Sequence, residues 1–174
     1  MIHILKTRLN KGILTKPAEI FLQPDSGTRE EIEALGKELR SLIIKRFGRS
    51  LFLREVDTGS CGACESEIIA TTNPIYDIQR FGVNFVASPR HADALMVTGP
   101  VSKNMLLALK KTYEAVPEPK FIITVGCCAH DGGVFKNSYY THGGVKDFLP
   151  VELHIPGCPP TPTQIIKSLL AFLR

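Results

Sequence analysis

The chain has 174 residues and a formal net charge of +4, and 44% of its residues are hydrophobic. That length accommodates one domain with a full hydrophobic core, and the composition is ordinary for a globular protein. No window approaches the roughly 18 uninterrupted apolar residues of a membrane span, and the N-terminus lacks the features of a secretion signal. We therefore expect a cytoplasmic chain whose thiols stay reduced.

The charge is unevenly distributed along the sequence. Residues 1–54 carry 11 Lys and Arg against 6 Asp and Glu, whereas residues 55–174 carry 10 against 11. An excess of basic residues such as that in residues 1–54 usually forms a solvated surface. The alternative is a segment that docks on an acidic partner or on lipid headgroups. We expect no nucleic-acid binding, because no aromatic-interleaved basic patch or known binding motif accompanies the charge.

The chain in order predicts an N-terminal arm followed by alternating strands and helices. Residues 1–27 have no periodicity, so we expect an extended arm there and a single domain over residues 28–174. Thr28-Arg29-Glu30-Glu31 is a capping box, which predicts a helix ending near Gly48. The pattern further predicts strands over 51–56, 84–87, 94–99, 121–125 and 151–155, and helical segments over 65–72, 75–81, from a cap at Ser102 to Pro117, and from Thr161 and Pro162 onward.

Strands that alternate with helices predict an α/β fold, with an open, mostly parallel sheet and helices on both faces, as in flavodoxin-like proteins. Cys61, the pair Cys127–Cys128, and Cys158 each follow a few residues after a predicted strand. In such sheets, ligands bind beyond the carboxyl ends of the strands. We therefore expect these loops to converge at the C-terminal edge of the sheet.

Five cysteines in three clusters predict metal or redox chemistry in a cytoplasmic chain. Thiolates suit zinc and iron–sulfur clusters, and surrounding glycines let backbone N–H groups approach the sulfurs. Cys61, Cys64 and Cys158 supply three of the four thiolates that a cubane cluster needs. One of the adjacent Cys127 and Cys128 supplies the fourth, and the other is spare.

Two other interpretations use the same cysteines. A structural zinc site in a non-redox binding module is the first, although zinc sites usually pair two Cys-x-x-Cys hairpins, and here one pair is followed by two separate positions. A thiol–disulfide enzyme built on Cys61 and Cys64 is the second, and it leaves the other three cysteines unexplained.

Three ordered motifs carry a resemblance to a known family. They are Thr58-Gly59-Ser60-Cys61-Gly62-Ala63-Cys64-Glu65, Gly126-Cys127-Cys128-Ala129-His130-Asp131-Gly132-Gly133 and Gly157-Cys158-Pro159-Pro160. Over about residues 50–174, the chain resembles the small iron–sulfur subunit of membrane-bound group 4 [NiFe] hydrogenases and of respiratory complex I, its 20 kDa subunit. The family's middle motif, Gly-x-Cys-Ala-x-x-Gly-Gly, makes Cys128 the ligand.

The resemblance implies one [4Fe–4S] cluster held by Cys61, Cys64, Cys128 and Cys158, in an electron-transfer subunit of an ion-translocating oxidoreductase complex. It implies a large hydrogenase-like or 49 kDa-like catalytic subunit, a ferredoxin-like iron–sulfur subunit and membrane-embedded subunits as partners, at the cytoplasmic face of the membrane. The Cys-x-x-Cys spacing resembles the hydrogenase branch, because complex I subunits typically have two adjacent cysteines there. Gly62-Ala63 departs from the usual Asn-Gly, which leaves a sulfur- or polysulfide-reducing relative open.

Three polar residues near the cysteines have two possible roles each. Glu65 lies at a predicted helix N-terminus, where an acidic side chain is favourable; passing protons is the alternative. His130 and Asp131 belong to a predicted cysteine loop, where a surface or hydrogen-bonded role competes with tuning of the cluster.

Overall fold

The structure is a computed structural model that describes residues 28–174, so the predicted arm over residues 1–27 lies outside the described residues. Five strands form one all-parallel sheet in the order β2-β1-β3-β4-β5. The strands are β1 (Leu51–Asp57), β2 (Val83–Phe85), β3 (Ala94–Thr98), β4 (Phe121–Val125) and β5 (Leu153–Ile155). This is the flavodoxin-like strand order, so the predicted fold class is confirmed.

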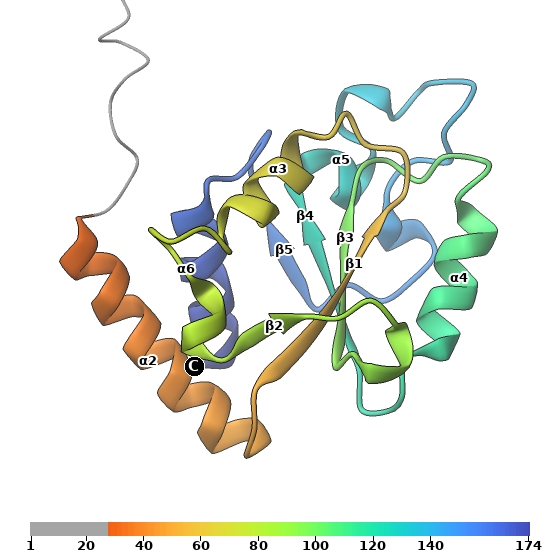
Figure 1. The fold of residues 1–174 in the computed structure, drawn as a ribbon. Coiled ribbons are helices and arrows are strands. Elements are labelled where there is room, and N and C mark those ends of the chain that lie inside the picture. The colour runs from red at the N-terminus through yellow and green to blue at the C-terminus, as the bar shows by residue number, and fades with distance from the viewer. Residues whose placement is uncertain (1–27) are drawn as a thin grey trace, which may run out of the picture.

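Helices cover both faces of the sheet (Figure 1). The helices α2 (Arg29–Phe47) and α6 (Pro162–Leu173) pack together on one face, and α4 (Leu106–Ala115) lies on the other. The shorter helices α3 (Ala63–Ala70) and α5 (Gly126–Asp131) follow β1 and β4 at the upper edge of the sheet in Figure 1. Short 3₁₀ helices are η2 (Ile78–Phe81), η3 (Pro89–His91), η4 (Gly133–Phe135) and η5 (Val145–Asp147).

The core has one layer on each side of the sheet, and strand alternation divides the apolar residues between them. In β3, Ala94 and Met96 belong to the layer under α2 and α6, whereas Leu95 and Val97 belong to the layer under α4. All five residues of β3 are buried, as expected for a central parallel strand covered on both faces.

Capping residues set the helix ends largely as the sequence predicts. Thr28 and Glu31 form the predicted capping box of α2, and Gly48 ends that helix in the left-handed conformation. Thr161 caps α6 as predicted. The prediction that Ser102 caps the next helix was wrong, because Ser102 bridges to Thr141 and α4 begins only at Leu106.

The site-bearing segments differ from the predictions in three respects. The helix α3 spans Ala63–Ala70 rather than 65–72, so Cys64 lies in its first turn. The segment Gly126–Asp131, expected as a loop, forms the helix α5, which ends at Gly132. The last strand begins at Leu153 rather than at residue 151.

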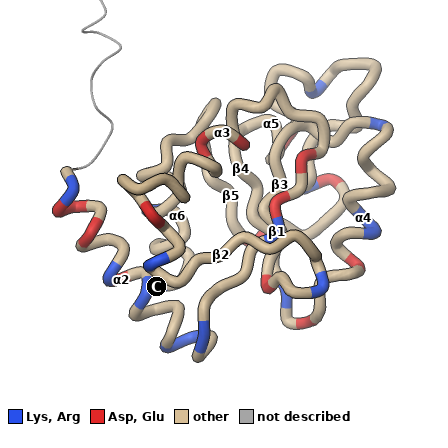
Figure 2. The backbone as a smooth tube through the Cα atoms, in the orientation of Figure 1, with Lys and Arg blue, Asp and Glu red and all other residues tan. Residues whose placement is uncertain are grey.

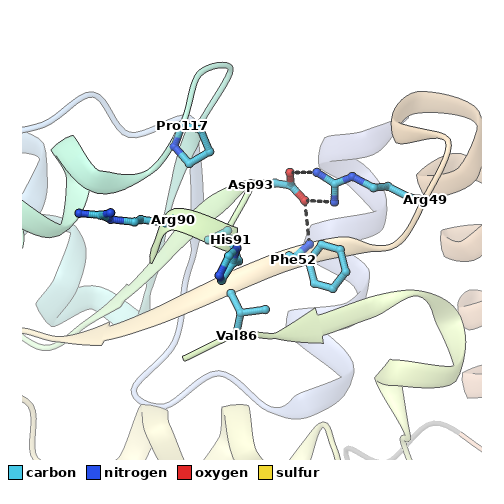
Figure 3. Close-up of a pocket in the computed structure, with 8 residues that line it drawn as sticks. Arg49, Phe52, Val86, Arg90, His91, Asp93 and Pro117 are labelled. Atoms are coloured by element: carbon cyan, nitrogen blue, oxygen red, sulfur yellow. Dashed lines mark hydrogen bonds and ion pairs between the residues drawn. The ribbon is translucent and has the colours of Figure 1, made fainter. Parts of the chain in front are cut away.

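The edge of the sheet remote from the cysteines is held by one partly buried carboxylate. Asp93, just before β3, accepts two hydrogen bonds from the guanidinium of Arg49 and a third from the Phe52 N–H at 2.9 Å (Figure 3). The hydrogen bond and charge of Asp93 raise the pKa of Arg49 despite some desolvation. Arg90, His91 and Pro117 line the same hollow, so the ion pair forms one side of a pocket that lies near the starts of β1 and β3.

Charge is also divided along α2, as Figure 2 shows. Its first turn carries Glu30 and Glu31, and its last turn carries Lys45 and Arg46. This arrangement complements the helix dipole at both ends. Within residues 28–174, no helix combines the length and the apolar character needed to cross a membrane.

Candidate functional site: a cavity lined by five cysteines

The cysteine loops leave the sheet at the carboxyl ends of β1, β4 and β5. Because all strands run parallel, these ends meet at one edge. The order β2-β1-β3 reverses direction at β1, so the crevice between β1 and β3 is the topological switch point where ligands of this fold class bind. Cys61 and Cys64 follow β1, and Gly99 and Pro100 follow β3, on the two sides of that crevice.

Two polar side chains shape the Cys61 loop. The Asp57 carboxylate accepts the backbone N–H groups of Gly59 and Ser60, both at 2.7 Å. The buried Thr58 hydroxyl donates to the carbonyl of Thr98 at 2.8 Å, which fastens the loop to the end of β3. The loop is thereby set before α3 begins, and α3 then carries Cys64 in its first turn.

Gly126 allows the second cysteine segment to approach the first. It has a φ of +82°, and a Cβ placed on it would lie 2.7 Å from the Cys64 Sγ. Any side chain would therefore collide with that sulfur and would also be strained in the left-handed region. The absence of a side chain brings the start of α5, with Cys127 and Cys128, against Cys64.

The third loop is tied to α5 through one carbonyl group. The Gly157 carbonyl accepts the backbone N–H of Cys127 at 3.0 Å and the Cys127 thiol at 3.3 Å. Cys158 follows this carbonyl directly. This carbonyl therefore fixes the positions of Cys127 and Cys158 relative to each other, although 30 positions of the chain separate Cys127 from Gly157.

All five cysteines line a single cavity at this edge of the sheet. The four predicted ligands are among them, and so is Cys127. Cys61, Cys127 and Cys158 are exposed, whereas Cys64 and Cys128 are half-buried, and all five are free thiols. Within residues 28–174, no three His, Cys, Asp or Glu side chains lie close enough together to hold one metal ion.

The thiols in this cavity are mutually repulsive when ionised. Burial raises the pKa of Cys64 to about 12, and the negative charges of Glu65, Cys128, Cys61 and Cys158 reinforce the effect. Burial also raises the pKa of Cys128, as does Cys158, while a hydrogen bond from the Val134 backbone N–H lowers it. Four thiolates in this space need positive charge to compensate them.

The side chains of Cys127 and Cys128 differ in their contacts. The Cys127 thiol donates its proton to the Gly157 carbonyl at 3.3 Å. The Cys128 thiol is half-buried and lines the cavity.

Polar residues beside the cavity are placed differently from one another. Both Glu65 carboxylate oxygens are buried and find no hydrogen-bond partner within residues 28–174. The pKa of Glu55 is raised, first by the burial of its own carboxyl group and next by the negative charge of Glu65. Asp131 is hydrogen-bonded: it accepts the Gly133 N–H at 3.0 Å, and this bond lowers its pKa. The His130 ring stacks on His154 with centroids 4.1 Å apart.

Several residues that line the cavity were not predicted from the sequence. Phe135 in η4 lines it, as do Ser60 and Ala63 of the first loop. The Gly-Gly pair before Phe135 signals a turn but does not reveal where the ring points. Next to Phe135 on the same segment, Val134 and Tyr139 are 86% and 87% exposed, so this side of the cavity carries an uncovered apolar surface.

Comparison with known proteins identifies the family. The family described as NADH ubiquinone oxidoreductase, 20 Kd subunit, matches residues 61–172. The chain is 43% identical to the probable membrane-bound hydrogenase subunit mbhJ of Pyrococcus furiosus over 83% of this chain and 86% of that protein. It is also 43% identical to an NADH-quinone oxidoreductase subunit of Citrifermentans bemidjiense over 65% of this chain and 66% of that one.

A solved structure is also similar to this one. A chain in the structure of the membrane-bound sulfane sulfur reductase, an archaeal respiratory membrane complex, superposes with a TM-score of 0.61 at 27% identity. The match covers 84% of this chain and 76% of that chain. The resemblance seen in the motifs is confirmed: the chain belongs to the 20 Kd subunit family of NADH ubiquinone oxidoreductase, an iron–sulfur subunit family of multisubunit oxidoreductase complexes.

Proposed function

We propose that this chain is an electron-transfer subunit that binds one [4Fe–4S] cluster through Cys61, Cys64, Cys128 and Cys158. The observation that carries the proposal is that the cysteines, from three segments of the sequence, line one cavity at the switch point of the sheet. Such a cluster supplies one-electron redox chemistry when bound. The four thiolates hold it, and the surrounding backbone orients them.

The donor set suits an iron–sulfur cluster. Thiolates are the ligands that such clusters use, and the cysteines of three segments line one cavity here. The hydrogen bond that the Cys127 thiol donates to the Gly157 carbonyl supports Cys127 as the spare thiol and Cys128 as the ligand. Disulfide exchange is less well supported, because a nucleophilic thiol needs a lowered pKa and that of Cys64 is raised.

The uncovered apolar surface beside the cavity supports docking of a catalytic partner there. Val134, Phe135, Tyr139 and Tyr140 are exposed on one segment, and Phe135 also lines the cavity. Exposed aromatic and aliphatic groups beside a site mark protein–protein contacts. We propose that this surface contacts a large hydrogenase-like or 49 kDa-like subunit, whose own centre exchanges electrons with the cluster.

The remaining partners follow from the relatives. The subunit mbhJ and the sulfane sulfur reductase are named as membrane-bound, so we propose a peripheral position at the cytoplasmic face, with a ferredoxin-like subunit and membrane-embedded subunits as further partners. Of the possible activities, we favour a hydrogenase-like complex, because mbhJ is 43% identical to this chain, whereas the sulfane sulfur reductase chain is 27% identical. A sulfur-reducing or quinone-reducing complex is the alternative.

Metal analysis of the purified complex tests the proposal. We expect the wild-type complex to hold four irons and four acid-labile sulfides more than complexes that carry Cys61→Ser, Cys64→Ser, Cys128→Ser or Cys158→Ser, and we expect these variants to lose the paramagnetic signal of this cluster on reduction. Unchanged iron and sulfide with the loss of one zinc in these variants would show a zinc-stabilised module instead. Nickel in the partner subunit would identify a hydrogenase, and its absence would favour the sulfur- or quinone-reducing alternatives.

A further inference from the structure

The three cysteine segments meet at one small cluster of atoms around the Gly157 carbonyl. That oxygen accepts both the N–H and the thiol of Cys127. A Cβ on Gly126 would lie 3.4 Å from the same oxygen and 2.7 Å from the Cys64 Sγ. The sulfur of the first segment, the start of α5 and the carbonyl of the third segment are therefore packed around one position.

The direction of the Gly157 carbonyl controls the position of Cys158. This carbonyl and the Cys158 N–H belong to one planar peptide unit, in which they point in opposite directions. Holding the oxygen toward α5 therefore fixes the orientation of the Cys158 N–H and the place from which its side chain departs. Cys127 supplies two donors to that oxygen, and the thiol is the one that depends on the side chain.

We propose that Cys127 is a positioning residue: its thiol ties the Cys158 loop to α5 and holds the Cys158 sulfur in place without binding iron. The inference rests on the proposed function, since it concerns the order of a ligand loop. It assigns a role to the fifth cysteine, which the four-ligand cluster leaves unused.

The purified complex carrying Cys127→Ala or Cys127→Ser tests this role. Alanine removes the side-chain donor, whereas serine keeps one. The serine hydroxyl is a stronger donor than the thiol that it replaces. Thr112→Ala is the matched control: the Thr112 hydroxyl donates to the Ala108 carbonyl at 2.8 Å in α4, on the other face of the sheet. The measurements are the rate at which an iron chelator bleaches the cluster, its midpoint potential and the paramagnetic spectrum of its reduced state.

The expected result is a cluster of full iron content in all variants that is lost faster only in Cys127→Ala. We expect a factor of roughly two to ten, which corresponds to the net contribution of one hydrogen bond. The spectrum and potential of this variant should also shift, and Cys127→Ser should restore the wild-type behaviour.

Three outcomes would overturn the inference. Wild-type behaviour of Cys127→Ala would show that the tie has no effect, and equal changes in the serine and alanine variants would show that hydrogen bonding is not the cause. A Cys127→Ala complex that lacks the four irons of this cavity would make Cys127 a ligand. A wild-type complex with no more iron and sulfide than the Cys61→Ser complex would instead overturn the proposed function, so the two failures are distinguishable.

Discussion

Replacing Gly126 by alanine is expected to disrupt the cluster site. The new Cβ would lie 2.7 Å from the Cys64 Sγ, whereas carbon atoms and their neighbours normally approach to about 3.5–4.0 Å. The sulfur must then move by roughly 1 Å, about twice the 0.5 Å within which a functional site has to be held. The left-handed backbone adds a cost of about 1–2 kcal/mol for a residue with a side chain. We expect the complex to lose more than half of the four irons and four sulfides that the proposed cluster contributes.

Gly62→Ala separates the two effects. Gly62 has a φ of +86°, close to the +82° of Gly126, and a Cβ placed on it meets nothing within 4 Å. The Gly62→Ala variant should therefore lose the same amount of stability from backbone strain, about 1–2 kcal/mol, while it keeps its cluster. Iron and sulfide analysis with thermal unfolding of both purified complexes measures the difference. Equal iron and sulfide in the two variants would refute the steric argument.

Three further predictions concern the rest of the fold. Gly36→Ala should lower the free energy of unfolding by about 1–3 kcal/mol, seen as a lower denaturant midpoint, because the added methyl group collides with the Phe81 ring; an unchanged midpoint would contradict this. Asp93→Ala should cost about 1–3 kcal/mol in the same assay by leaving the Phe52 N–H without its acceptor, with unchanged iron content as the control. Burial lowers the pKa of His154 below its ordinary 6.5, so the folded state favours the neutral ring. The free energy of unfolding should therefore fall as the pH decreases below about 6.5. His154→Gln should make this pH dependence weaker, and an unaltered pH dependence would exclude His154 as its cause.

Much of the fold follows from local sequence signals. The capping box at Thr28 and the cap at Thr161 act within a few residues, and the apolar β4 segment is a strand over the range predicted. The helix α5 was missed because its six residues are too few to show a helical period and because Gly126 and Gly132 bound it. Ser102 has the right residue type for a cap, but its contact with the distant Thr141 competes with that role.

The site was predictable in its residue types but not in its detailed contacts. Parallel strands bring the cysteine loops to one edge, and this could be inferred from strand order alone. The packing of Gly126 on Cys64 and the tie from Cys127 to Gly157 join segments far apart in sequence. The burial of the Glu65 carboxylate depends on how α3 lies on the sheet, which no local pattern encodes.

The parallel arrangement of the sheet also bears on how the protein matures. A growing polypeptide that has emerged only through β3 contains Cys61 and Cys64, and the sulfur of Cys158 arrives at the cavity only when β5 pairs with β4 through its three residues. Pairing between segments that are remote in sequence is intrinsically slow. Loading of the proposed cluster would therefore wait for the edge strand to join, and the cluster would then link that short strand to the centre of the sheet.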